Sequence, residues 1–230
     1  MEVIPGVHAI GGLSTGRAYL YQEADRLTLI DTSQASNTAR IINEIERTGR
    51  KPGDLQQIII THCHDDHTGS LAELVDRTGA QVLVHTEDAP VVRGEGMPLP
   101  PVLPGFERIL FAVLVRSMKA AQPARVDREL ADGDEIDLDG GARVVHTPGH
   151  TPGNIAIFLP KRRLLFTGDA AGGGPTGSPA LGVFNADPRV ARESFRKLAA
   201  LDFDVACFGH GRPLDKDASL AFRRTVERFG

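Results

Sequence analysis

The chain has 230 residues, a formal net charge of −4 and two cysteines. Folding at this length buries roughly 70% of the accessible surface, so the core needs no disulfide framework. The charge excludes the basic excess that nonspecific nucleic-acid binding requires. Residues 1–5 lack the pattern of a secretion signal, and the apolar run 109–115 is too short to span a bilayer. We therefore expect one domain over residues 1–230, a cytoplasmic location, and neither a nucleic-acid nor a membrane partner.

Extended and helical patterns alternate in the first part of the chain. Residues 17–22 and 26–31 predict a hairpin, and 37–48 predict a helix with isoleucines at helical spacing. A short buried strand follows at 58–60, then a helix that Gly79 closes, then a strand at 81–85. This order predicts helices packed on a partly parallel sheet.

An unusual segment interrupts this order around residues 94–120. Four prolines between Gly94 and Gly105 prevent a regular element there, and an apolar helical stripe that includes Leu110 and Val113 follows. Phe111 and Val115 make this stripe wider than a one-sided surface helix needs. We expect these two side chains to line a pocket, to face a partner subunit in a homodimer, or to pack in the core, and the insertion to lie over the substrate.

The second part of the chain has a similar order. Residues 134–138, 142–146, 155–159 and 163–167 predict strands, followed by a helix at 189–201, a strand at 205–208 and a helix at 219–229. Two halves, each made of strands with flanking helices, predict an α/β fold in which four layers form an αββα sandwich.

Histidines and aspartates gather where the predicted strands end. His62, His64, Asp66 and His67 follow the strand at 58–60, and three further residues follow other strands: His150, Asp169 and His210. Loops at strand ends are common places for active sites. Imidazole and carboxylate ligands together suit zinc, manganese or iron. The sequence therefore predicts a metal site at one edge of the sheets.

This pattern resembles the metallo-β-lactamase superfamily over nearly the whole chain. The resemblance rests on His62-x-His64-x-Asp66-His67, followed in order by His150, Asp169 and His210. It implies two divalent metal ions, zinc before manganese or iron. The first would be held by His62, His64 and His150, and the second by Asp66, His67 and His210. Asp169 would bridge both ions, and Asp31 would support the site from behind.

The resemblance also implies an activity. A hydroxide bound by the two metal ions would attack a small ester, thioester or lactone, with Asp66 as the catalytic proton shuttle. Leu110 and Val113 are expected to line an acyl pocket, and Gly172 to shape its rim. The alternative is a mononuclear iron enzyme of the same fold that oxidises a thiol or persulfide with dioxygen. Ala170 to Gly177 lacks the cysteine-glycine-arginine segment of such dioxygenases.

Two further residues near the predicted ligands have plainer interpretations. Strand alternation points Cys63 away from His62 and His64, which indicates a packing residue. His146 precedes His150 by four residues. It either supports the metal site or is a buried residue with a single hydrogen bond.

Overall fold

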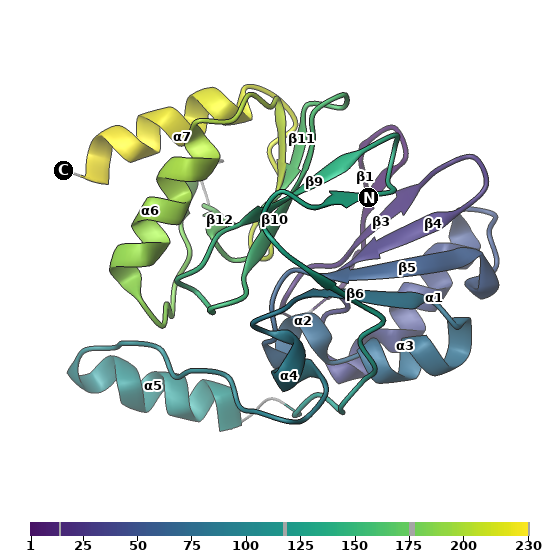
Figure 1. Cartoon of the computed structure of the whole chain (residues 1–230), viewed down its shortest axis with the longest axis horizontal. Helices are drawn as coiled ribbons and strands as arrows, with labels where there is room; N and C mark the ends of the chain where they lie inside the picture. The colour runs from purple at the N-terminus through teal and green to yellow at the C-terminus, as the bar shows by residue number, and fades with distance from the viewer. Residues whose placement is uncertain (14, 117–118, 175–177, 230) are drawn as a thin grey trace.

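The computed structural model describes residues 1–230 except 14, 117–118, 175–177 and 230. The side chains of residues 107, 110 and 114–116 also lie outside the description, so the expectations for Leu110 and Val115 fall there. Two sheets are stacked face to face, and helices cover their outer faces (Figure 1). The predicted four-layer αββα sandwich is confirmed.

The first sheet has seven strands in chain order. The first four, β1 to β4, pair antiparallel, and β4 to β7 pair parallel. The predicted hairpin is β3 and β4. The strands are β1 (Glu2–Ile4), β2 (Val7–Ala9), β3 (Tyr19–Gln22), β4 (Leu27–Ile30), β5 (Leu55–Ile60), β6 (Gln81–His85) and β7 (Arg128–Leu130).

The second sheet has the strand order β14-β11-β10-β9-β8. Its strands pair antiparallel except β11 with β14, which pair parallel. They are β8 (Glu135–Ile136), β9 (Ala142–His146), β10 (Ile155–Leu159), β11 (Leu164–Phe166) and β14 (Val205–Cys207). The strand expected at 134–138 is shorter than predicted. Beside this sheet, β12 (Ala171–Gly173) and β13 (Pro179–Leu181) form a two-stranded ribbon.

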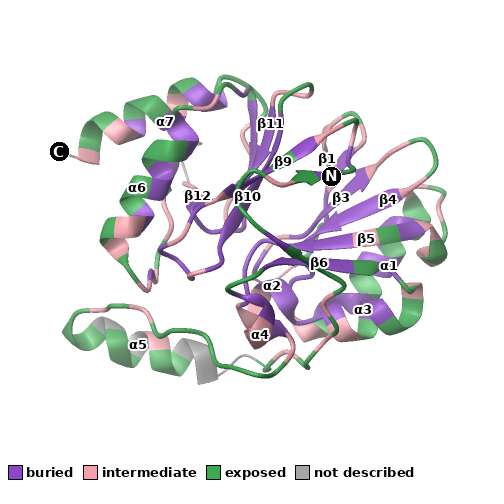
Figure 2. Cartoon of the chain, viewed as in Figure 1, coloured by how far each residue is buried: buried purple, intermediate pink, exposed green. Residues whose placement is uncertain are grey.

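Alternating side chains of the strands build three apolar layers. In β5, Ile58 and Ile60 face the helices, whereas Ile59 faces the other sheet. In β10, Ile157 faces the first sheet and Phe158 faces the helices of the second. Both faces of these strands are therefore buried, which explains their continuous apolar sequence. Figure 2 shows this burial in the two sheets.

Two pairs of helices complete the sandwich. The helices α1 (Thr38–Arg47) and α3 (Leu71–Thr78) cover the first sheet, and α6 (Pro188–Ala199) and α7 (Ala218–Val226) cover the second. The short helices α2 (Asp65–Thr68) and α4 (Ala89–Val92) follow β5 and β6. Short 3₁₀ turns lie at Ala35–Asn37, Pro52–Asp54 and Glu227–Phe229. None of the helices in the described ranges is long and apolar enough to cross a membrane.

The predicted insertion stands beside the sandwich. Residues 95–104 form no helix or strand, and α5 (Gly105–Arg116) follows as expected. Figure 1 shows α5 set off from the sheets, on the side of α4 and the lower end of α6. Phe106, Ile109 and Val113 are exposed on this helix, whereas Phe111 is partly buried. The helix therefore turns only part of its apolar surface toward the rest of the chain.

Candidate metal centre

The sandwich brings the predicted ligands to one edge. His62, His64, Asp66 and His67 follow β5, and His150, Asp169 and His210 follow β9, β11 and β14. Their ligand atoms form three overlapping groups within 4.8 Å: His62/His64/His150, His62/His67/Asp169 and Asp66/His67/His210. All seven residues expected at the metal site are thus brought together.

Asp169 lies at the centre of this cluster. Its Oδ1 is 3.6 Å from His67 Nε2, and its Oδ2 lies 3.5 Å from His150 Nε2 and 3.3 Å from His210 Nε2. On one side His64 Nδ1 is 2.9 Å from His150 Nε2, and on the other Asp66 Oδ2 is 3.1 Å from His210 Nε2. One carboxylate therefore reaches both ends of the cluster.

Unpartnered buried atoms show that this donor set fits a cation. Within the described part of the chain, His62 Nε2 and Asp169 Oδ1 are buried without a hydrogen-bond partner. A buried acceptor without a partner is costly, and a cation among these atoms would satisfy both. Nitrogen and carboxylate oxygen donors without a thiolate suit zinc, manganese or iron.

The protonation of the cluster differs between its two sides. Burial lowers the pKa of His62 and His64, and lowers the pKa of His150 to about 4, so these rings are neutral as metal ligation requires. Burial also disfavours charge on His67 and His210, but nearby carboxylates outweigh it. Asp31 and Asp169 raise the pKa of His67 to about 9, and Asp169 raises that of His210 to about 10. A cation bound on this side would displace these protons.

The carboxylates on that side are ionised. Burial raises the pKa of Asp66, but His67 and His210 outweigh it and bring the pKa to about 2. The pKa of Asp169 is held well below its ordinary value against burial, chiefly by His67 and His210. Both aspartates therefore carry their negative charge at neutral pH.

Asp31 supports the side of the cluster that contains His67. The side chain accepts hydrogen bonds from Thr61 N (2.8 Å) and Thr61 Oγ1 (2.7 Å), and Oδ2 is 2.9 Å from His67 Nδ1. It therefore fixes the orientation of the His67 ring and leaves Nε2 directed at Asp169. The position of Asp31 agrees with the supporting role expected from the sequence.

Asp88 occupies the corresponding place on the other side and was not anticipated. The carboxylate is 1% exposed and accepts hydrogen bonds from Cys63 N (2.9 Å), Thr151 Oγ1 (2.7 Å) and Gly153 N (2.8 Å). Asp88 thereby joins the loop after β5 to the loop after β9. These two loops carry His62, His64 and His150. Nothing in the sequence distinguishes Asp88 from an exposed aspartate at the end of a strand.

The loop that carries His210 is held by β3 and the residues before it. Tyr19 Oη donates to Phe208 O at 2.8 Å, Arg17 N donates to Gly209 O at 2.8 Å, and Arg17 Nε donates to Gly211 O. Gly209 has a steric reason to be glycine, because a Cβ there would lie 2.0 Å from Asp169 Oδ1. This close approach lets Asp169 reach the centre of the cluster.

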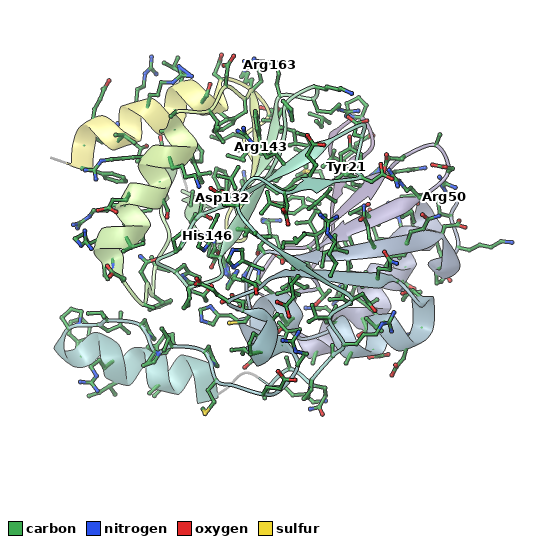
Figure 3. The ribbon with its side chains drawn as sticks, viewed as in Figure 1. Tyr21, Arg50, Asp132, Arg143, His146 and Arg163 are labelled. Atoms are coloured by element: carbon green, nitrogen blue, oxygen red, sulfur yellow. The ribbon has the colours of Figure 1, made fainter. Side chains whose placement is uncertain are left out.

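His146 lies beside the cluster rather than in it. Its Nε2 donates to Pro152 O at 2.7 Å, and its ring stacks on His85 at 4.1 Å between centroids. Its backbone N donates to Asp132 Oδ1, and Figure 3 shows these two residues as neighbours. His146 therefore contacts the loop that holds His150. Cys63 is buried, as its predicted packing role requires.

A cavity of about 410 Å³ opens above the cluster. Its floor contains His64, Asp66, His150, Asp169 and His210, and its other lining residues are Thr15, Asp65, Pro98, Leu99, Pro100, Pro101, Phe111, Val183 and Phe184. The insertion therefore lines the cavity through residues 98–101 and through Phe111. Val113 is instead 63% exposed and borders a different hollow. Gly172 lines a smaller hollow that shares Asp169, Val183 and His210 with this cavity.

Comparison with known proteins gives consistent matches. The family model described as the metallo-beta-lactamase superfamily matches residues 11–210. A probable metallo-hydrolase of Bacillus subtilis (strain 168) is 30% identical, over 93% of this chain and 86% of that protein. A hydroxyacylglutathione hydrolase of Ruegeria pomeroyi is 32% identical over 86% of this chain. The chain spans only 63% of the length of that second relative.

Solved structures match the whole fold. A metallo-beta-lactamase family protein from Thermus thermophilus aligns with 99% of this chain and 80% of its own at a TM-score of 0.74 and 21% identity. A subclass B3 metallo-beta-lactamase of Bradyrhizobium japonicum aligns with 100% of this chain and 91% of its own at a TM-score of 0.71 and 24% identity. At these identities the likeness concerns the fold.

Proposed function

The chain belongs to the metallo-beta-lactamase superfamily and is a metal-dependent hydrolase, and we propose that it uses two divalent ions to hydrolyse a small ester, thioester or lactone. The observation that carries this proposal is the set of three overlapping ligand groups on the floor of one cavity. The relatives named hydroxyacylglutathione hydrolases favour the thioester among these bonds.

Each side of the cluster would hold one ion. His62, His64 and His150 would hold the first, Asp66, His67 and His210 the second, and Asp169 would contribute to both. Zinc is the ion that we propose, since neutral imidazoles and carboxylates are its common ligands. The ions supply Lewis acidity, which lowers the pKa of a water molecule and stabilises negative charge on the substrate oxygen.

The protein's own groups position the substrate and move the proton. Asp66 lines the cavity and is ionised, so its carboxylate can accept a proton from the attacking water and deliver it to the leaving group. His210 Nε2, 3.1 Å from Asp66 Oδ2, orients that carboxylate. The side chain of His210 is 43% exposed, which places it at the mouth of the site. Asp31 and Asp88 hold the ligand-bearing loops from behind.

Metal analysis combined with a substrate panel tests this function. We expect about two zinc ions per chain and turnover of esters, thioesters or lactones. Asp169→Ala should remove both the ions and the turnover, because it deletes the carboxylate shared by the two sides. Cys63→Ala, a change in the same ligand loop, should leave the metal content as it is. One iron per chain with oxygen uptake on a thiol or persulfide would refute the proposal in favour of a dioxygenase.

A further inference from the structure

The walls of the cavity above the metal cluster are mostly apolar. Pro98 to Pro101 form one side, Phe111 projects from α5, and Val183 and Phe184 belong to the loop between β13 and α6. The volume of about 410 Å³ is near the lower end of the ~300–1,000 Å³ range of small-molecule sites. A compact apolar group fits such walls.

Two phenylalanines from distant segments meet at this wall. The ring centroids of Phe111 and Phe184 are 5.0 Å apart, with 48° between the ring planes. Phe184 adopts a positive φ of 58°, which is unusual for an aromatic residue. Strained conformations of this kind are found at ligand clamps, where the surroundings hold them. Phe184 is therefore directed by its backbone toward the cavity and Phe111.

Hydrogen bonds fix this wall to the metal site. Val102 N donates to Asn185 O at 2.9 Å, which joins the proline-rich segment to the Phe184 loop. Ala186 N donates to His150 O at 3.2 Å, and Asp187 N donates to Gly149 O at 2.8 Å. On the other side, Asp65 Oδ1 accepts a hydrogen bond from Ala121 N at 2.9 Å. The wall is thus connected to the ligand loops on both sides before any substrate binds.

The charges around the cavity disfavour an anionic substrate group within it. Among the described residues that line the cavity above its floor, Asp65 is the one charged side chain, and no lysine or arginine is present. Arg108 instead lines an adjoining hollow that shares Pro100, Pro101 and Phe111 with the cavity. A carboxylate moved into an apolar enclosure without a cationic partner loses its hydration at a large cost.

These observations together point to a substrate class. We propose that the cavity selects an uncharged, apolar acyl group, which packs between Phe111 and Phe184 while its carbonyl lies over the metal cluster. This inference rests on the proposed hydrolase function. The two phenylalanines are specificity-determining residues, because they contact the acyl chain but none of the ligand atoms.

A series of straight-chain thioesters of N-acetylcysteamine, from acetyl to octanoyl, tests the acyl preference. We expect kcat/KM to rise about two- to fourfold per methylene until the cavity is filled, since each methylene leaves water for an apolar wall. Phe111→Ala and Phe184→Ala should flatten this rise, because they should lower kcat/KM for the octanoyl thioester more than for the acetyl thioester. Phe106→Ala is the matched control, because Phe106 lies on the same helix and is 76% exposed. Butyrate and octanoate, with the carboxylate over the metal cluster and the chain between the apolar walls, should inhibit competitively, and octanoate should inhibit more strongly than butyrate.

The outcomes separate the two proposals. Turnover of the series with no dependence on chain length, or with a preference for succinyl over butyryl thioesters, would overturn the apolar acyl site and leave the hydrolase intact. Absence of hydrolysis across the whole panel by zinc-loaded protein would instead refute the proposed function itself.

Discussion

Replacing Asp88 by asparagine tests whether one buried carboxylate positions the ligands of the first ion. Asparagine is nearly isosteric and keeps one acceptor oxygen, which can serve Cys63 N and Thr151 Oγ1. Its amide nitrogen would then face Gly153 N, so that one buried donor loses its partner. An unsatisfied buried donor costs about 1–3 kcal/mol, and the two retained bonds lose their charge assistance. We expect the free energy of unfolding to fall by about 2–4 kcal/mol.

The same change should weaken metal binding. Groups that orient metal ligands commonly contribute about 10- to 100-fold in affinity. Urea unfolding of the chelated protein measures the stability, and competition with a chromophoric chelator measures the affinity of each ion. Asp25→Asn, in the exposed turn between β3 and β4, is the control. Lower stability with an unchanged affinity for both ions would refute the positioning role, and unchanged stability would refute the hydrogen-bond argument as well.

Three further changes probe other parts of the site. Gly209→Ala should lower stability and metal content together, because the new methyl group would lie 2.0 Å from Asp169 Oδ1, whereas Gly53→Ala meets nothing within 4 Å and should leave metal content as in the wild type. In chelated protein, the raised pKa of His67 stabilises the fold fully below its ordinary value of 6.5, and this contribution is lost as the pH rises through about 9. Between pH 6.5 and about 9, the melting temperature of His67→Asn should therefore fall less than that of the wild type. An equal fall would contradict the interaction of His67 with Asp31 and Asp169. Tyr19→Phe should lower the free energy of unfolding in urea by about 1 kcal/mol, the typical net contribution of one hydrogen bond. Tyr21→Phe is the comparison, because the buried Tyr21 hydroxyl has no hydrogen-bond partner among the described residues.

The sequence predicted the sandwich and the ligand cluster because both depend on local patterns. Ile58 to Ile60 indicated a buried strand, and polar residues directly after it indicated a strand-end site. The very short strands β1, β2 and β7 were not anticipated, because three residues carry too little periodicity to be recognised. The strand β12, which contains Gly172, was not anticipated for the same reason.

The walls of the site could not be predicted in the same way. Phe111 and Phe184 meet across a long stretch of sequence, and only the fold shows that their rings are 5.0 Å apart. Helical spacing predicted an apolar face for α5 but left open whether Phe111 faces a pocket, a partner subunit or the core. Phe111 lines the cavity, whereas Val113, which was expected there, is exposed. Asp88 was overlooked for a similar reason, because its importance comes from two loops that are distant in sequence.

The two ends of the insertion lie next to each other. Ala124 N donates to Val92 O at 3.0 Å, and Gly94 packs so closely on Pro123 that a Cβ would lie 2.7 Å from Pro123 Cγ. The chain therefore leaves the sandwich near residue 93 and returns to it at the same place near residue 123. The entropy lost on closing a loop depends only weakly on its length, so a shorter segment would change this entropy modestly. The segment that lines the cavity and the loops that carry the metal ligands are therefore separate stretches of sequence. A change in the length of this segment leaves every ligand residue in its own loop, so the shape of the cavity and the composition of the metal cluster can be altered independently by mutation.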